Sequence, residues 1–480
     1  MKKILYTSLF LMMAVLSLSA QVDRSKRPVS GPAPTINLGN PQTFKMKNGL
    51  EVLVVENHKL PQVSFSLRID NPPLFEGDIK GVDDLASEMM GNGTTTVSKE
   101  KFNERLDFYA ASANLHLNGF GGSCLSRHFK DVFSLVVDGA LNPLLTQEEL
   151  DSKRNQYLDG LKADEKNPKQ IIRDVRSKLL YLNHPFGELV TEESLKRVTL
   201  EDVQKRHRES YIPAKAYLVI VGDVKFNEVK KLAEGLLSKW NTKAPAYPAR
   251  VSPEGVSTTE ICFVDVPNAV QSEISVSNLV DLKMTNPDYF AALLANQVVG
   301  GGADGRLFMN LREAHGWTYG SYSNISADIL DPTSFTATAS VRNQVTDSAV
   351  VEMMKEINLM STGLATKEEL DLVKAKYVGG FVMGAEKPTT VASFAIAQRT
   401  QALPADFYKN YIKNVEAVTL DNVKDASKKY ILGGQSRIVV VGKAVEVLEK
   451  LEKLGYPVKY YDRLGNPVER PDTKLPVAAE

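Results

Sequence analysis

Asp84 and Glu88 form the first pair of side chains whose spacing suggests chemistry. They lie in the segment GVDDLASEMMGNGTTT (residues 81–96), where apolar residues recur on one face and two glycines follow, which predicts a helix that ends in a glycine turn. Carboxylates at positions i and i+4 share a helix face, and a hard divalent cation prefers such oxygen ligands. Ser87, between them, carries no group that can act as a base at neutral pH.

These two carboxylates alone do not predict a metal site. Ca²⁺ takes about six to eight oxygen ligands and Mg²⁺ a near-octahedral set, whereas Asp83 and Asp159 are the only further carboxylates that suggest themselves as donors. No two of the six histidines have ligand spacing, and Cys124 and Cys262 lack the C-x-x-C spacing of a thiolate zinc site. We therefore expect solvated carboxylates and two buried free thiols, although a disulfide between the cysteines stays open.

A second candidate site pairs an arginine with a tyrosine seven residues later, Arg312 and Tyr319, in the segment GGGADGRLFMNLREAHGWTYGSYS. A guanidinium group and a phenolic hydroxyl are suitable hydrogen-bond donors for a carbonyl oxygen that gains negative charge. The alternative is structural: Arg312 ends a helix and pairs with Glu313 or another surface acid, and Tyr319 is a strand aromatic. Spacing alone does not decide between these two interpretations.

The elements that must position these residues occur in two copies. EELDSKRNQYLDG (148–160) returns as EELDLVKAKYVGG (368–380), VTLEDV (198–203) as VTLDNV (418–423), and YLVIVGD (217–223) as RIVVVGK (437–443), each pair 220 positions apart. Repetition at one fixed distance indicates a duplicated domain. Each copy combines alternating apolar segments, which predict strands, with amphipathic helices. The predicted fold class is α+β, with two homologous domains, each a mainly antiparallel sheet with helices on one face.

The ends and the middle of the chain have the composition of segments outside these domains. Lys2 and Lys3 precede an apolar run that ends at Ser19-Ala20, the pattern of a secretory signal cleaved after Ala20. No later run is apolar enough to cross a bilayer, so we expect a periplasmic or secreted protein without a membrane span in its mature chain. The predicted order is a signal peptide (1–20), a flexible lead-in (21–40), an N-terminal domain (41–242), a linker (243–260), a C-terminal domain (261–460) and a tail (461–480).

The charge balance gives no case for nucleic acid as a partner. The 480 residues carry 58 acidic and 58 basic side chains, and 43% of the residues are apolar. A nucleic-acid module is expected to show a basic stripe interleaved with aromatic residues, and the sequence has none.

Several motifs together resemble the pitrilysin/insulinase family of zinc peptidases along nearly the whole mature chain. The matching stretches are FKMKNGLEVLVVEN, HPFGELVTEESLKRVTLEDV, YIPAKAYLVIVGDV, DVPNAVQSEI, the helix at 81–94 and the segment that begins GGGADGR. In that family two histidines of H-x-x-E-H and a downstream glutamate hold zinc, and the helix glutamate activates water. The corresponding positions here are Asp84, Ser87, Glu88 and Gly160. The resemblance therefore implies a degenerate zinc site, with no metal ligand set and no catalytic residue in this chain.

The resemblance also implies roles for the second candidate site. The family's C-terminal half contains an Arg/Tyr pair that contacts the substrate backbone and the oxyanion, which corresponds to Arg312 and Tyr319. A glycine-rich loop of inactive subunits touches incoming substrate, so Gly300, Gly301 and Gly302 are candidate substrate-loop residues.

Small bacterial members of the family often work as pairs of chains, which gives the leading functional expectation. This chain resembles the non-catalytic subunit of a periplasmic zinc metallopeptidase, whose homologous partner holds the zinc and whose substrates are peptides. A stand-alone peptide- or protein-binding pseudopeptidase, with no hydrolytic role, is the alternative from another functional class. An active enzyme that uses an unexpected metal at Asp84 and Glu88 is the third hypothesis, and no complete ligand set supports it.

Overall fold

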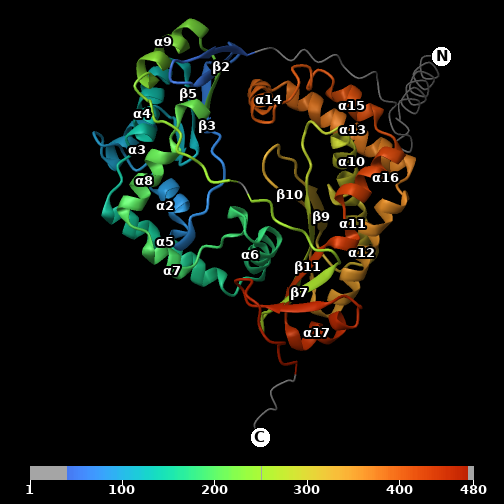
Figure 1. The fold of residues 1–480 in the computed structure, drawn as a ribbon. Coiled ribbons are helices and arrows are strands. Elements are labelled where there is room, and N and C mark those ends of the chain that lie inside the picture. The colour runs from blue at the N-terminus through green and yellow to red at the C-terminus, as the bar shows by residue number, and fades with distance from the viewer. Residues whose placement is uncertain (1–40, 250, 474–480) are drawn as a thin grey trace, which may run out of the picture. The chain divides into compact units, whose positions relative to one another are not determined.

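The computed structural model of this protein describes residues 41–249 and 251–473, so the predicted signal peptide and lead-in lie outside the described residues. Two six-stranded sheets, one in each half of the chain, organise the fold (Figure 1). The fold class predicted from the sequence, α+β with two similar sheet-and-helix halves, is confirmed.

The first half contains a sheet of order β1-β2-β6-β3-β5-β4. Its strands are β1 (Gln42–Lys45), β2 (Glu51–Glu56), β3 (Gln62–Ile69), β4 (Ser112–His116), β5 (Gly119–Leu125) and β6 (Ala216–Gly222). Its α-helices are α2 (Val82–Met89), α3 (Lys99–Phe108), α4 (Phe129–Leu141), α5 (Gln147–Asp164), α6 (Pro168–Tyr181), α7 (Glu192–Arg197), α8 (Leu200–Ser210) and α9 (Phe226–Leu237).

The second half repeats this arrangement, with strand order β12-β7-β11-β8-β10-β9. Its strands are β7 (Glu260–Asp265), β8 (Gln271–Val280), β9 (Ser321–Ile325), β10 (Thr333–Arg342), β11 (Arg437–Gly442) and β12 (Val458–Tyr461). Its helices are α10 (Tyr289–Gly300), α11 (Arg306–Phe308), the π-helix η5 (Met309–Ala314), α12 (Thr346–Thr362), α13 (Lys367–Ala385), α14 (Pro388–Thr400), α15 (Tyr411–Ala417), α16 (Leu420–Tyr430) and α17 (Ala444–Glu452).

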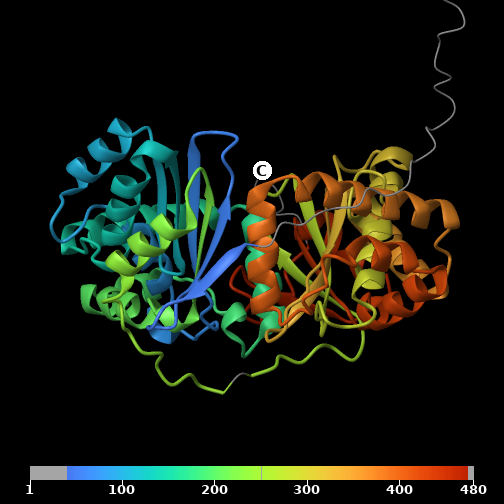
Figure 2. The same cartoon turned by 90° about the horizontal axis from the view of Figure 1, so that it is seen from above.

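Each sheet is mixed but mainly antiparallel. In the first sheet only β2 and β6 pair in parallel, and in the second the parallel pairs are β7 with β11 and β7 with β12. The buried central strands β6 and β11 come from the repeated segments YLVIVGD and RIVVVGK, whose continuous apolar runs suit strands covered on both faces. Figure 2 shows the strands of each sheet running side by side.

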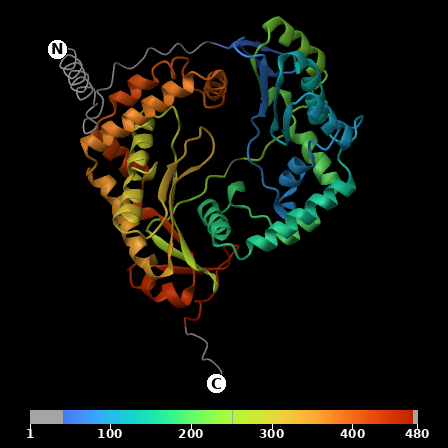
Figure 3. The ribbon, with the colours of Figure 1, turned by 180° about the vertical axis from the view of Figure 1, so that it is seen from behind.

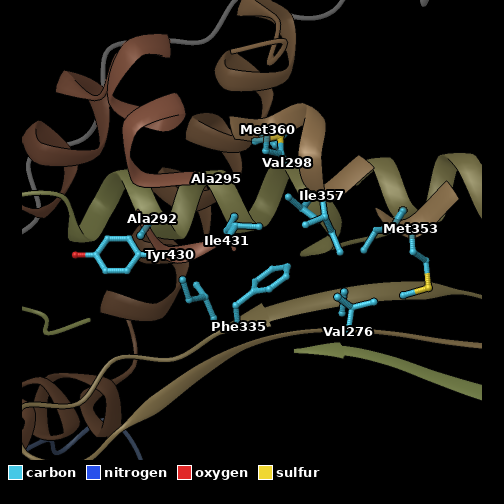
Figure 4. Close-up of a cluster of buried hydrophobic side chains, with 14 of the residues drawn as sticks. Val276, Ala292, Ala295, Val298, Phe335, Met353, Ile357, Met360, Tyr430 and Ile431 are labelled. Carbon is cyan, nitrogen blue, oxygen red and sulfur yellow. The ribbon is translucent and has the colours of Figure 1, made fainter. Parts of the chain in front are cut away.

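The core of each half lies between its sheet and its own helices. In the second half α12 contacts β8 and β10, α10 contacts β9, and α16 packs against α10 and α12. Phe335 and Val276 of the sheet belong to one buried cluster with Ala295 of α10 and Ile357 of α12 (Figure 4). Tyr430, at the end of α16, closes the same cluster and is almost fully buried. The small alanines of α10 allow this helix to approach the sheet closely, which close packing requires.

One helix from each half packs on the sheet of the other half. Helix α6 contacts β8 and β11 (Figure 3). Its buried face contributes Val175 and Leu179 to a cluster with Val439 and Val441 of the second sheet. Helix α14 contacts β6 of the first sheet. Its two buried alanines pack there with three residues of β2 and β6: Ala392, Ala395, Leu53, Val219 and Val221. Pro168 begins α6 and Pro388 begins α14, and these prolines are 220 positions apart. The two helices are therefore equivalent elements of the two copies, and each covers the sheet of the other copy.

The segments on the two sides of the second half differ in structure: the one before β7 is irregular, and the one after residue 460 is partly ordered in the sheet. No helix or strand occurs among the described residues of the predicted linker before β7. At the other end, β12 pairs with β7 up to Tyr461, and the amide of Val468 donates to the carbonyl of Tyr460 at 3.0 Å. The predicted tail (461–480) therefore begins too early, because the sheet extends past residue 460. None of the described helices is both long and apolar enough to cross a membrane.

Candidate functional site

Helix α2 begins where a buried glutamate caps it. Gly81, the residue before the helix, has a φ of 105°, a conformation that favours glycine. The Glu76 carboxylate accepts the amide hydrogens of Gly81 at 2.9 Å and Asp83 at 3.1 Å, which satisfies donors that a helix start leaves unpaired. The Asp83 carboxylate forms a two-pronged ion pair with Arg206 of α8. Both oxygens of Asp83 are therefore occupied by the ion pair with Arg206, so this carboxylate is not a further metal donor.

Ser87, the residue in place of the family's catalytic glutamate, has a structural role. Its hydroxyl donates to the carbonyl of Asp83 at 2.8 Å and accepts the amide hydrogen of Leu117 at 3.2 Å. Leu117 follows the edge strand β4, so this side chain ties α2 to the sheet. Among residues 41–249 and 251–473, the hydroxyl has no carboxylate or imidazole partner that would activate it.

The residues of α5 that face Asp84 and Glu88 are Tyr157 and Lys153. The Tyr157 hydroxyl donates to Asp84 at 3.0 Å, and the Lys153 ammonium lies 3.5 Å from the carboxylate of Glu88. Gly160, which we predicted at the downstream ligand position, has no atom within 4 Å of where a Cβ would lie. The assignment of Gly160 to the ligand position therefore stays a prediction, and the α5 side chain that contacts Asp84 is Tyr157.

A concave pocket of about 360 Å³ adjoins Asp84. Its lining includes five carboxylates, those of Asp84, Asp164, Glu165, Asp174 and Glu188. Desolvation against the pocket wall raises the pKa of Asp84, although the hydrogen bond from Tyr157 opposes this effect. Arg463, from the turn after β12, enters the same lining and pairs with Glu165 at 2.6 Å.

The side chains around α2 do not fit a zinc ion. Zinc in proteins is bound by histidine, cysteine or carboxylate ligands in a tetrahedral set, and here one carboxylate is bonded to Tyr157 while Glu88 is 67% exposed beside a lysine. Within residues 41–249 and 251–473, no group of three or more His, Cys, Asp or Glu side chains is arranged to hold a metal ion. Cys124 and Cys262 are both buried free thiols, and burial raises the pKa of Cys262 to about 12.

Arg312 and Tyr319 are brought together by an irregular stretch of helix. Arg312 lies in the π-helix η5, a rare conformation that is frequent at functional sites. Its Nη1 donates to the backbone carbonyl of Tyr319 at 2.9 Å, and its guanidinium lies 4.9 Å from the ring centre of Phe308. The Tyr319 side chain is 88% exposed, so its hydroxyl is available to another molecule. A 3.5 Å contact of Arg312 with Glu313 is also present, as the structural interpretation predicts, and it leaves the guanidinium half-exposed.

Gly300, the last residue of α10, and the two glycines that follow it allow a tight fold at the end of this helix. A Cβ on Gly300 would lie 2.7 Å from the amide nitrogen of Ser323, and one on Gly301 would lie 2.3 Å from an oxygen of Gln297. A Cβ on Gly302 would lie 3.1 Å from Asp304. Close packing within the loop therefore explains Gly300 and Gly301, while a role in substrate contact remains a prediction.

Each sheet ends in an edge strand beside one of the candidate sites. β4 is the edge of the first sheet and contacts α2, and β9 is the edge of the second and contacts α10 and α11. Tyr322 of β9 is half-exposed and its ring lies over Gly320, so the surface around Tyr319 carries two accessible tyrosines. Sequence patterns did not indicate the π-helix or the contact between Tyr157 and Asp84.

Sequence comparison identifies related proteins. Residues 197–377 match the family described as "Peptidase M16 inactive domain". An "Uncharacterized zinc protease YmxG" from Bacillus subtilis is 22% identical over 289 residues, 58% of this chain and 69% of the relative. A "Non-peptidase homolog YmxG" from Helicobacter pylori is 22% identical over 389 residues, 79% of this chain and 88% of the relative.

Two solved structures share the fold. The crystal structure of a peptidase M16 inactive domain from Pseudomonas fluorescens matches with a TM-score of 0.76 and 22% identity, over 85% of this chain and 99% of that one. The periplasmic protease PqqL from Escherichia coli matches with a TM-score of 0.69 and 14% identity, over 88% of this chain but 49% of that chain. This chain thus has the fold of about half of the longer protein.

Proposed function

Because this chain is a relative of the M16 peptidases in which the zinc motif is absent, we propose that it is the non-catalytic subunit of a periplasmic zinc metallopeptidase. Its partner is a homologous chain with an intact H-x-x-E-H motif, which holds the zinc and performs hydrolysis. The contact of Arg312 with the backbone of Tyr319, which holds two donor side chains together on an exposed surface, is the observation that carries the proposal.

The contribution of this chain follows from the chemistry of those two donors. A guanidinium group and a phenolic hydroxyl can donate hydrogen bonds to backbone carbonyl oxygens of a peptide, and such donors matter most where an oxygen gains negative charge. Phe308 stacks beneath the Arg312 guanidinium and the Tyr319 carbonyl accepts from it, so its direction is fixed before a peptide arrives. Preorganised donors of this kind need no reorganisation during reaction.

Two further observations support pairing with a second chain. In the part of the chain that the structure describes, the acids and the tyrosine around α2 do not form a metal ligand set. A solved periplasmic protease is about twice the length that this fold covers, as expected if two chains of this size together match one longer molecule.

The test is to combine the purified chain with a homologous chain from the same genome that carries H-x-x-E-H, and to measure cleavage of a fluorogenic peptide library. We expect turnover well above that of the partner alone. Arg312→Gln and Tyr319→Phe should each lower turnover by about 10²-fold, the scale of removing one oxyanion donor, while complex formation is retained. The matched control Arg342→Gln alters an exposed arginine of the same sheet and should leave turnover unchanged. Unchanged turnover after addition of an equimolar amount of this chain would refute the proposal.

A stand-alone peptide-binding role is the second candidate, and the unpaired edge strands β4 and β9 favour it. An extended peptide can add to such an edge through main-chain hydrogen bonds alone. Under this proposal the chain binds peptides with no partner present, and Arg312→Gln leaves that affinity unchanged. Binding that depends on Arg312 together with activation of a partner would favour the subunit role instead.

A further inference from the structure

A groove separate from both candidate sites runs between α4 and α9 in the first half. Its volume is about 540 Å³, within the range of small-molecule sites. Apolar side chains form its floor, and these are Phe129, Val224, Val229, Leu232 and Leu236. We call this feature the α4–α9 groove. Its walls come from helix positions at i, i+3 or i+4 spacing, because one face of each helix turns toward the groove.

The rim of the α4–α9 groove carries three cations. Arg127 and Lys130 lie on the α4 side and Lys231 on the α9 side. Among the described residues, none of the three has an acidic side chain within ion-pair distance, although Arg127 donates to the ring of His128 at 3.0 Å. Unpaired cations beside an apolar floor are an environment that favours an anion with an apolar body.

The negative charges of the two acids that line the groove, Asp223 and Glu228, are partly neutralised by neighbouring residues. Both oxygens of Asp223 accept hydrogen bonds, one from His58 at 2.7 Å and one from Ser126 at 2.9 Å. The hydrogen bond to Asp223 raises the pKa of His58, which favours its charged form beside this carboxylate. Glu228 lies 3.7 Å from Lys225. Both acids of the groove therefore have cationic neighbours other than Arg127, Lys130 and Lys231, and the positive charge of these three rim residues is not neutralised by them.

Gly235 keeps the groove open. It lies inside α9, lines the groove, and has no atom within 4 Å of the position that a Cβ would occupy. Glycine lowers helix stability relative to other residues at an exposed helical position, so helix formation does not explain it. A side chain here would occupy space that is open in this structure, at a position that lines the groove.

From this combination we propose that the α4–α9 groove binds a monomeric amphipathic carboxylate, with its acyl chain on the apolar floor and its carboxylate on Lys130, Lys231 and Arg127. The ligand class is a medium-chain fatty acid. The groove lies at neither the α2 region nor the Arg312 surface, so this binding does not depend on the proposed peptidase-subunit role.

Calorimetric titration of the purified chain with sodium decanoate, below the concentration at which it forms micelles, tests the proposal. We expect saturable binding of one decanoate per chain, and weaker binding of decanol and of decyltrimethylammonium by at least about tenfold in dissociation constant. Equal affinity for all three compounds would overturn the assignment of the cations, and no saturable binding of decanoate would overturn the site. Vesicles containing phosphatidylglycerol form a further arm, and binding to vesicles without binding to decanoate would also overturn it.

Two variants locate the binding. Gly235→Leu fills the groove while favouring the helix, and Lys130→Gln with Lys231→Gln removes the rim charge; each should weaken decanoate binding by at least about tenfold. The matched controls are Gly379→Leu, at an open glycine of α13, and Lys101→Gln with Lys428→Gln, two exposed lysines on other helices. If the controls weaken binding as much as the groove variants do, the ligand lies elsewhere. Circular dichroism confirms that each variant is folded.

Discussion

Truncation of one leucine on α6 tests the exchange of helices between the halves. Leu179 is 6% exposed and packs with Val439 and Val441 of the second sheet, although α6 belongs to the first half of the sequence. Leu179→Ala removes three carbons at about 0.8 kcal/mol each, and a cavity term adds to this loss. Because Leu179 lies two residues before the end of α6 at Tyr181, the site can partly relax. We therefore expect a loss of about 2–3 kcal/mol.

Amide hydrogen exchange resolves which sheet loses this stability. If α6 covers the second sheet, the amides of β8 and β11 should exchange about 30- to 150-fold faster in Leu179→Ala, since each 1.4 kcal/mol is about tenfold. The amides of β3 should change far less. The matched control Leu237→Ala alters a fully buried leucine of α9 in the first-half core, and it should accelerate β3 instead. Faster exchange in β3 with unchanged β8 and β11 after Leu179→Ala would refute the reasoning.

Three further predictions concern single side chains. Ser87→Ala removes the hydrogen bonds that tie α2 to the sheet and should lower the free energy of unfolding by about 1 kcal/mol in urea titration; an increase would contradict the structure. Restoring H-x-x-E-H at residues 84–88 should not give tight zinc binding by dialysis and elemental analysis, whereas adding Tyr157→Glu should, because the Tyr157 side chain contacts residue 84 and a carboxylate there supplies a third ligand. Hydrogen bonding to Asp223 raises the pKa of His58, so its stabilisation is present below about pH 6.5 and is lost as pH rises through the folded-state value. The difference in melting temperature between the wild type and His58→Gln should therefore shrink as pH rises from about 6 to 8, and a difference that grows would refute the assignment.

The fold class could be predicted from the sequence because both the internal repeat and the periodicity of apolar residues can be recognised directly in the sequence. The repeat of YLVIVGD as RIVVVGK predicted two copies of a buried strand, and these are β6 and β11. The glycine turn after residue 90 predicted the end of α2. These features depend on contacts that are local in sequence or on a pattern repeated at a fixed distance.

The candidate sites were predicted less completely, for physical reasons. The spacing of Arg312 and Tyr319 is local, so their proximity could be expected, but the π-helix that directs Arg312 depends on packing around Phe308. Gly160 was assigned by counting along the chain, and counting did not indicate that the Tyr157 side chain contacts Asp84. Leu150 of α5 is buried with residues of several distant elements, so the contacts between α5 and α2 are not local in sequence. The exchange of α6 and α14 was not predicted, because an apolar helix face does not specify which of two similar sheets it covers.

The reciprocal placement of α6 and α14 affects how this gene can be divided. A fragment that ends in the segment before β7 contains α6 without the strands it covers, and it contains the first sheet without α14. The complementary fragment has the same two deficits in reverse. Two such fragments made separately would each expose apolar surface. Only co-expression in one compartment would let each fragment cover the exposed sheet of the other. Fission at the middle of this open reading frame therefore yields an obligate pair and not two free-standing proteins.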